Sequence, residues 1–373
     1  MAHTSPLAGN WVNFLLSWFE KEQRDFPWRR EINTYHTWIC EVMSQQTTLG
    51  VVLPKYREFI SVLPNVQSLA ACSETQLRQL WAGLGYYARA RNLQKGAQYL
   101  VEQCAGHFPT TYEGWLVVPG CGPYSASVIS SICFSCRAAC VDGNVIRVVS
   151  RLLALSEGVW QSSGQNQIRE FVNAAIPAEA PGNFNQAMME LGATVCKKQN
   201  PLCGSCPVSF ACADFAKELI PHCPPAKPRR AFVEKTVYAF VLSDKANKRV
   251  ALLQRGKGFL SQTVGFPLLK GSSAKSREAL DWACRPAAVT LTQAPKTISH
   301  TITHHRIKGV VLAAEVNALQ ADQMAWIASL TLQLNAKGSV DWLPENSVAE
   351  HLASSLDQKL WQLFADFRGR QNP

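Results

Sequence analysis

Four cysteines near the middle of the chain have the spacing of a metal-binding loop. Cys196, Cys203, Cys206 and Cys212 follow the pattern C-x6-C-x2-C-x5-C. Four thiolates so close together suit either a zinc ion or an iron–sulfur cluster. Zinc sites usually combine two C-x2–4-C pairs, and this loop has one such pair. The spacing therefore favours an iron–sulfur cluster, with zinc or four buried structural cysteines as the alternatives.

A glutamate on a predicted helix is a candidate acid. The segment Thr37–Leu49 reads as one helical run with an apolar side. Glu41, Gln45 and Thr48 share the opposite stripe, because residues spaced i, i+4 and i+7 lie on one face of a helix. Such a stripe is either exposed to solvent or lines a cleft.

An aspartate later in the chain could face that glutamate. Asp142-Gly143-Asn144 precedes an apolar helix predicted over Val145–Leu155. Either Asp142 or Asn144 would make an ordinary N-cap. A Glu held in a cleft with an Asp opposite it is also the usual equipment for breaking a glycosidic bond. The pair is therefore a candidate for either role.

A glycine-rich turn separates two helical segments. It has the sequence PGCGPY and includes Gly120 and Gly122. Glycine permits positive φ and close approach of another backbone. Successive amide N–H groups that open onto the next helix form a concave anion site. The turn can therefore hold a phosphate without a basic side chain, or it is a plain connection between helices.

The elements that must position these residues are helices. From Asn10 to Phe215 apolar residues repeat at helical spacing, as in Leu77, Leu80 and Trp81, and runs of alternating β-branched residues are scarce. We expect an all-α domain over residues 1–220. Its short breaks are predicted at Pro27, Pro54, Pro64, Pro109 and residues 119–122.

The composition changes at PHCPPAKPRR, residues 221–230. Dense proline cannot continue a helix, so residues 221–234 read as a linker. Residues 235–373 read as an α+β domain. Its predicted strands are Lys235–Leu242, Lys248–Leu253, Thr297–His304 and Lys308–Val316, and its predicted helices are Ser276–Cys284 and Val348–Phe367.

Composition and charge narrow the class of protein. A hydrophobic share of 47% excludes a disordered chain. No apolar stretch reaches the length of a membrane span, and the first ten residues do not resemble a signal peptide, so we expect reduced cysteines and a cytoplasmic protein. The net charge of +10 lies mostly after Pro224, where 20 Lys and Arg face 11 Asp and Glu. This excess favours a polyanionic partner.

The order of these motifs resembles the helix–hairpin–helix DNA glycosylases that carry a four-iron cluster, and within them the adenine DNA glycosylases of the MutY type. The resemblance covers nearly the whole helical domain. It rests on FPWR (26–29), EVMSQQT (41–47), GLGYYARAR (83–91), PGCGPY (119–124), VDGNV (141–145), FNQAM (184–188) and the four cysteines.

The resemblance implies a multidomain fold and a reaction. The all-helical glycosylase domain would hold a [4Fe-4S] cluster on the four cysteines, and the α+β domain would be Nudix-like. Glu41 would protonate an extruded adenine, and Asp142 would stay ionised to stabilise the sugar. Tyr124 and Asn144 would orient these groups, and Arg29 would line the site. Gln46 and Tyr86 would enter the base stack.

The resemblance also separates subfamilies. Relatives of the endonuclease III type place a lysine near the end of the hairpin, where it forms a Schiff base. This chain has Tyr124 there, which predicts a monofunctional glycosylase. In the family the C-terminal domain recognises 8-oxoguanine through Phe-Ser-His, and this chain has Ile302-Thr303-His304 instead. Thr303 and His304 keep the hydroxyl and the imidazole.

The expected partner is duplex DNA that contains adenine opposite 8-oxoguanine or guanine, bound by a monomer at the nucleoid. Two alternatives remain at this point. One is a glycosylase and lyase for oxidised pyrimidines, which needs a Schiff-base lysine. The other is a non-catalytic iron–sulfur module that binds DNA or senses redox state.

Overall fold

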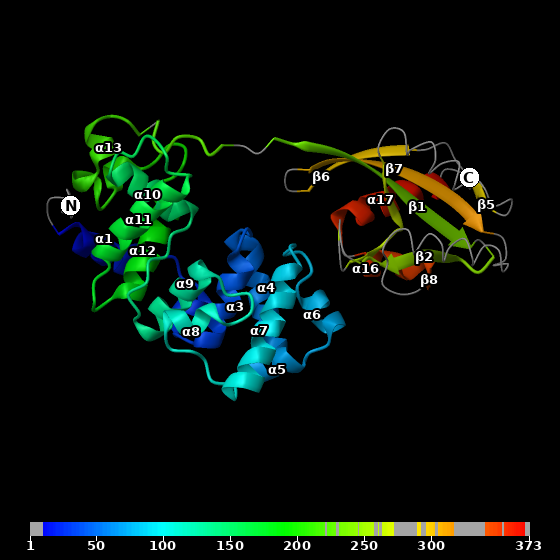
Figure 1. Cartoon of the computed structure of the whole chain (residues 1–373), viewed down its shortest axis with the longest axis horizontal. Helices are drawn as coiled ribbons and strands as arrows, with labels where there is room; N and C mark the ends of the chain where they lie inside the picture. Colours follow the sequence, from blue (N-terminus) through cyan, green and yellow to red (C-terminus); the bar gives the residue numbers. More distant parts are fainter. Residues whose placement is uncertain are drawn as a thin grey trace. The chain divides into compact units, whose positions relative to one another are not determined.

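The chain divides into two compact units in a computed structural model. The structure describes residues 10–220, 222–228, 231–244, 246–256, 260, 263–271, 289–291, 296–302, 305–316, 340–352 and 354–369. The units are Met1–Pro228 and Arg229–Pro373, so their boundary lies inside the segment that the sequence assigns to a linker. The first unit contains helices α1 to α13, and the second contains the strands (Figure 1).

The described residues of the first unit are helical, as predicted. The helices before the hairpin are α1 (Trp11–Glu22), α2 (Pro27–Arg30), α3 (Thr34–Ser44), α4 (Leu49–Val62), α5 (Val66–Ala71), α6 (Glu74–Leu80), α7 (Ala88–Cys104) and α8 (Tyr112–Leu116). Those after it are α9 (Pro123–Phe134), α10 (Gly143–Leu152), α11 (Ser162–Ala175), α12 (Pro181–Thr194) and α13 (Ala213–Ala216).

Two hydrophobic cores divide these helices into two groups. One core gathers apolar residues of α3 to α9 around the fully buried Trp38, Trp81 and Trp115. The other gathers residues of α1, α10, α11 and α12 around Leu15 and Phe184. Figure 1 shows the two groups side by side, with α9 next to α12. Two packed groups of helices leave room for a site between them.

Two predicted features of the first group are wrong. The helix that begins before Glu41 ends at Ser44 and does not reach Leu49. It ends there because Gln46 has φ 57°, and Thr48 then starts α4 as its N-cap. Pro54 is not a break, since it lies inside α4. A proline there removes one backbone hydrogen bond, and the buried Val52, Tyr56 and Phe59 still hold the helix in the core.

The cysteine loop follows α12. It contains the 3₁₀ turns η1 (Cys203–Ser205) and η2 (Ser209–Ala211) and leads into α13. Beyond α13 the chain still contacts the helical unit. Arg151 Nε donates to the carbonyl of Cys223 at 2.8 Å, and Trp160 Nε1 donates to the carbonyl of Pro225 at 2.7 Å. The first part of the linker is therefore packed against the helices.

The second unit is built on a mixed sheet. The strands are β1 (Val233–Asp244), β2 (Arg249–Gln254), β3 (Val264–Gly265), β4 (Leu268–Gly271), β5 (Val289–Leu291), β6 (Lys296–Ile302), β7 (His305–Val316) and β8 (Asp341–Pro344). The main path runs β3-β2-β1-β7-β5, and β4, β6 and β8 pair with β1, β7 and β2. The long pairing of β1 with β7 is parallel, from Val233 opposite His305 to Asp244 opposite Val316.

A helix covers one face of this sheet. The turn η3 (Glu345–Ser347) leads into α16 (Val348–His351), and α17 (Ser355–Gly369) follows. Leu356, Leu360 and Phe364 pack against Val237 and other strand residues. The predicted single helix Val348–Phe367 is therefore two helices. Ser354 explains the break, because its hydroxyl accepts from the Asp357 N–H at 3.0 Å and caps α17.

Three sequence predictions for this unit lie outside the described residues. They are the helix Ser276–Cys284 and the two residues Thr303 and His304. The four predicted strands match β1, β2, β6 and β7 to within a few residues, and the end of the third lies outside the described residues. In the described part of the chain, no helix has both the length and the apolar character that crossing a membrane requires.

Candidate active site

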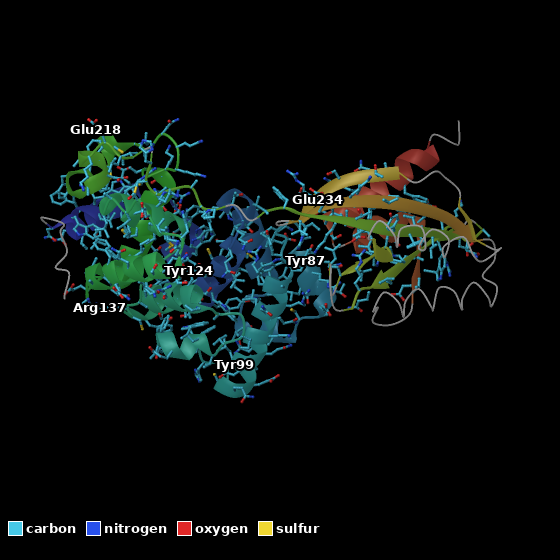
Figure 2. The ribbon with its side chains drawn as sticks, turned by 45° about the horizontal axis from the view of Figure 1, so that its top comes forward. Tyr87, Tyr99, Tyr124, Arg137, Glu218 and Glu234 are labelled. Carbon is cyan, nitrogen blue, oxygen red and sulfur yellow. The ribbon has the colours of Figure 1, made fainter. Side chains whose placement is uncertain are left out.

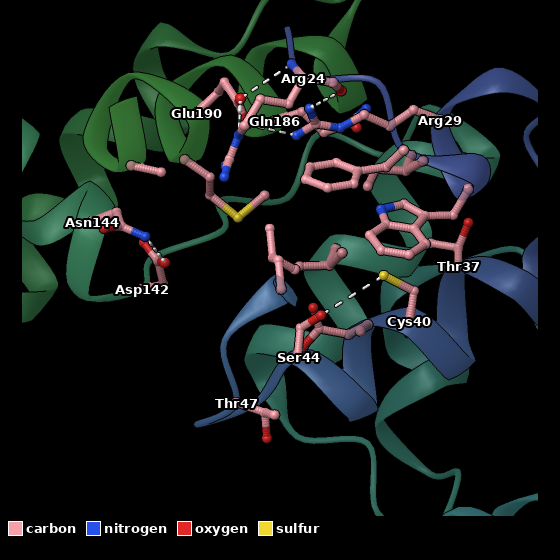
Figure 3. A pocket seen from close by; sticks show the side chains of 18 of the residues that line it. Arg24, Arg29, Thr37, Cys40, Ser44, Thr47, Asp142, Asn144, Gln186 and Glu190 are labelled. Atoms are coloured by element: carbon pink, nitrogen blue, oxygen red, sulfur yellow. Dashed lines mark hydrogen bonds and ion pairs between the residues drawn. The ribbon is translucent and has the colours of Figure 1, made fainter. Parts of the chain in front are cut away.

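A cavity of about 640 Å³ lies between the two helix groups of the first unit. Figure 3 shows it, with α3 on one side and the start of α10 on the other. All five predicted catalytic residues line this cavity: Glu41, Asp142, Tyr124, Asn144 and Arg29. The structure therefore brings together side chains from α2, α3, α9 and α10 that are far apart in the sequence.

Glu41 is a buried acid at the wall of this cavity. Its exposed fraction is 9%, so Glu41 faces a cleft, whereas Thr48 of the predicted stripe lies beyond the end of α3 and is exposed. Gln45 Nε2 and Ser125 Oγ donate to its Oε1 at 3.3 and 3.4 Å. Burial raises the pKa of Glu41 to about 7, the two hydrogen bonds oppose that rise, and the negative charge of Asp142 adds to it. A carboxyl group with this pKa is about half protonated at pH 7 and mostly protonated below it.

Asp142 is the N-cap of α10. Its Oδ1 accepts from the N–H of Val145 at 2.8 Å, and its Oδ2 accepts from Asn144 Nδ2 at 2.9 Å. Burial raises the pKa of Asp142, and these hydrogen bonds act in the opposite direction. Arg147 in turn donates to Asn144 Oδ1 at 2.9 Å and to the carbonyl of Cys196 at 2.7 Å. The side-chain amide of Asn144 is thus held at both ends: its oxygen accepts from Arg147, and its nitrogen donates to Asp142.

Tyr124 differs from its expected role in one respect. It lies in the first turn of α9 in the helical unit (Figure 2), and its side chain is half-buried. Its hydroxyl donates to Met189 Sδ at 3.2 Å, and no hydrogen bond joins it to Glu41 or Asp142 in this part of the chain. Burial raises the pKa of Tyr124, so the phenol stays protonated. Its ring forms a wall of the cavity next to both carboxyl groups.

The far wall of the cavity includes Arg24 and Glu190, two residues that the sequence analysis did not single out. Glu190 on α12 is 1% exposed and accepts from Arg24 Nε at 2.6 Å and from Arg29 at 2.9 Å. Burial opposes its charge, but the hydrogen bonds from Arg24 and Arg29 hold the pKa of Glu190 below its ordinary value. Figure 3 shows this group of three. A single carboxylate among the apolar residues of α12 is the sequence signal that could have found Glu190.

The predicted DNA-contacting residues of this unit lie on loops. Gln46 and Tyr86 are exposed and have φ of 57° and 48°. Gly120 has φ 85°, and a Cβ there would lie 2.8 Å from the Cβ of Asn92, so glycine is required. Gly122 is the N-cap of α9. The first N–H groups of α9 have no acceptor inside the helix, which leaves them for an anion.

The four loop cysteines lie near one another. Burial raises the pKa of the Cys206 thiol to about 12, and the neighbouring Cys196, Cys212 and Cys203 add to that rise. Arg151 donates to Cys196 Sγ at 3.3 Å. Among the described residues, no group of three or more His, Cys, Asp or Glu side chains is arranged to hold a single metal ion. The donor set of four thiols suits a cluster, which is larger than one ion and spreads its ligands more widely.

Comparison with known proteins identifies relatives of the helical unit. Residues 39–173 match the HhH-GPD superfamily of base excision DNA repair proteins. An adenine DNA glycosylase of Rattus norvegicus is 42% identical over 207 residues, which are 53% of this chain and 40% of that protein. The human one is 43% identical, and the match covers 38% of it. The chain thus spans about two fifths of the length of these mammalian relatives.

A bacterial relative and a solved structure extend the comparison. An adenine DNA glycosylase of Buchnera aphidicola subsp. Baizongia pistaciae is 30% identical over 254 residues, which are 68% of this chain and 72% of that protein. The structure of a thermostable thymine-DNA glycosylase has a TM-score of 0.51 at 25% identity and covers 55% of this chain and 95% of that one. With the superfamily match over residues 39–173, this coverage shows that the chain belongs to the adenine DNA glycosylase family.

Proposed function

We propose that the protein is a monofunctional DNA glycosylase that releases adenine opposite 8-oxoguanine or guanine in duplex DNA. One observation carries the proposal. Glu41 and Asp142 line the same cavity, and burial lets Glu41 keep a proton near neutral pH. An acid beside a carboxylate is the arrangement that glycosidic bond cleavage needs. The names of the relatives, adenine DNA glycosylases, support adenine as the base.

The reaction begins with extrusion of the nucleotide. A base inside a duplex cannot reach a buried acid, so it must leave the stack and enter the cavity. Gln46 and Tyr86 are exposed on neighbouring loops and present flat surfaces that can fill the gap. The N–H groups at the start of α9 are placed to bind a phosphate next to the site.

Inside the cavity the acid and the carboxylate act on opposite ends of one bond. Glu41 donates its proton to a ring nitrogen of the adenine, which makes the base a better leaving group. Asp142 carries the negative charge that stabilises the oxocarbenium-like sugar, and Asn144 keeps its Oδ2 oriented. Glu41, now ionised, can accept a proton from the attacking water. Glu190 and its two arginines offer acceptors and donors to the edge of a purine.

The absence of a lysine nucleophile supports a monofunctional enzyme. No lysine is among the described residues that line the cavity. Tyr124 occupies the hairpin position where a Schiff-base lysine would stand, and a phenol cannot form an imine. The site can therefore remove the base without cutting the strand.

A single-turnover assay on defined duplexes tests the proposal. Adenine should be released opposite 8-oxoguanine and guanine, and much less opposite thymine. Borohydride added during the reaction should trap no protein–DNA complex, because no imine forms. Release of an oxidised pyrimidine with a trapped complex would instead identify a glycosylase and lyase. Binding of duplex DNA without release of any base would identify a non-catalytic module.

We also propose that the second unit is a Nudix-like domain that contacts the oxidised guanine. The mixed sheet with α17 packed on one face is compatible with this assignment. The residues that the sequence suggests for the contact, Thr303 and His304, lie outside the described residues. The ratio of excision rates opposite 8-oxoguanine and guanine, measured with and without alanine at both positions, addresses their role.

The cysteine loop is proposed to hold a [4Fe-4S] cluster on Cys196, Cys203, Cys206 and Cys212. When bound, the cluster would supply iron–thiolate bonds that cross-link the loop to the end of α12. Purified protein should be brown and contain about four iron atoms per chain. Cys203→Ser should lose most of the iron and colour, whereas Cys136→Ser, on a remote loop, should keep both. A colourless protein with one zinc per chain would contradict the assignment.

A further inference from the structure

Arg89, in the first turn of α7, joins two loops that are far apart in the sequence. Its Nη1 donates to the carbonyls of Val42 and Met43 at 2.8 and 2.9 Å and also to that of Gln45. Its Nη2 donates to the carbonyls of Leu84 and Gly85 at 3.0 and 3.3 Å. One guanidinium thus binds the end of α3 and the loop before α7.

Both loops hold a non-glycine residue in the left-handed region. Gln46 has φ 57° and Tyr86 has φ 48°, a conformation that side chains with a Cβ rarely adopt. Such a conformation persists only where the surroundings fix it. Two of the carbonyls that Arg89 binds, those of Gln45 and Gly85, lie directly before these two residues. The last carbonyls of α3 have no donor inside the helix. Trp81 Nε1 also donates to the Gly85 carbonyl at 3.0 Å, but Arg89 is the group that binds both backbones at once.

Thr47 also takes part in the contact between the end of α3 and the loop before α7. We call this contact the junction. Its hydroxyl accepts from Arg89 Nη2 at 3.1 Å and lies 3.4 Å from the carbonyl of Leu84. Tyr86 itself is 52% exposed, and its ring lies 5.7 Å from the Arg89 guanidinium. Gln46 is exposed as well. Two exposed side chains are thus attached to one partly buried junction.

The helix that carries Arg89 also contacts the glycine hairpin. Asn92, one turn further along α7, lies so close to Gly120 that a Cβ on the glycine would meet its Cβ at 2.8 Å. A second glycine, Gly96, packs against the carbonyl of Pro119. One helix therefore sets the position of both exposed side chains relative to the backbone that is proposed to bind phosphate.

We infer that Arg89 is a positioning residue that makes Gln46 and Tyr86 one rigid wedge for extrusion of the nucleotide. The inference rests on the proposed function. Lysine cannot replace this arginine, because an ammonium is a compact charge with three donors, whereas the planar guanidinium reaches separate carbonyls at once. Loss of the junction should therefore impair extrusion and leave the acid and the carboxylate in place.

The test compares Arg89→Lys on two substrates with the full chain. In the first substrate the adenine is stacked in a duplex opposite 8-oxoguanine. In the second it lies in an unpaired bubble, so that little extrusion is required. Single-turnover excision from the stacked duplex should fall by about 10- to 100-fold, the loss expected when hydrogen bonds to a charged group are removed. Excision from the bubble should change by less than about threefold.

Further variants separate positioning from a general loss of structure. Thr47→Val removes the hydroxyl at the junction and keeps the size of the side chain. Its excision from the stacked duplex should fall by less than that of Arg89→Lys, and its excision from the bubble should again change little. Tyr86→Ala should show the same difference between the two substrates, and combining it with Arg89→Lys should add little, since both act on one step. Arg137→Lys, an exposed arginine at the margin of the helical unit (Figure 2), is the matched control and should change neither rate.

The outcomes distinguish the inference from the function on which it rests. If the unaltered protein releases no adenine from either substrate, the proposed function is wrong. If it does, and Arg89→Lys and Thr47→Val lower both rates equally or leave both unchanged, the positioning role of Arg89 is wrong. Unfolding temperatures of the variants show whether an equal loss comes from a destabilised fold.

Discussion

Glu41→Gln is expected to lower the single-turnover rate of adenine release by about 10²- to 10⁴-fold, the usual contribution of general-acid catalysis. The amide has the same shape as the acid and can still accept the hydrogen bonds that Gln45 and Ser125 donate to Glu41. The fold and duplex binding should therefore survive, while no proton is available for the base. Glu102→Gln, at an exposed position on α7, is the matched control and should release adenine at the normal rate.

The pH dependence of the same rate gives a second measure of this role. Burial raises the pKa of Glu41 to about 7, and the acid form is the active one. The rate should therefore be highest below about pH 7 and fall roughly tenfold per unit above it. At lower pH it should fall again as Asp142 takes up a proton. A rate that rises with pH through neutrality, or near-normal release by Glu41→Gln, would show that another group is the acid.

The sequence predicted the chemical groups because each one lies in a short local pattern. Glu41 is part of a polar stripe, Asp142 caps an apolar helix, and the four cysteines share a single loop. What the sequence could not show was which side of α3 faces a cavity. That depends on how the two helix groups pack, since the other walls come from α10 and α12. The shared cavity shows that Glu41 faces a cleft and not bulk solvent.

The groups that the sequence missed act through contacts between distant residues. Arg24 and Glu190 are separated by 166 residues, and no local pattern relates them. The early end of α3 has a similar cause, because Arg89 binds carbonyls at the end of that helix and so supports the left-handed Gln46. Periodicity alone continues the helix to Leu49. Local pattern therefore finds the elements, and tertiary hydrogen bonds decide where they end.

Asp142→Asn should reduce adenine release by about 10²- to 10³-fold or more, a loss typical when one group that stabilises transition-state charge is removed. Asp142 has two roles, and substitutions separate them. Asparagine keeps an oxygen that can accept from the Val145 N–H and so keeps the cap of α10, but it carries no charge. Alanine removes both.

The two roles predict different orders of activity. If the charge matters for the reaction, Asp142→Asn and Asp142→Ala release adenine equally slowly, although alanine destabilises the fold by about 1 kcal/mol more because the cap is lost. If Asp142 only caps the helix, asparagine keeps nearly full activity and alanine alone is impaired. Rates of base release and unfolding temperatures, measured on the same preparations, decide between them. We expect both variants to be equally slow, because Asn144 donates to the second oxygen of Asp142, and that oxygen takes no part in the cap.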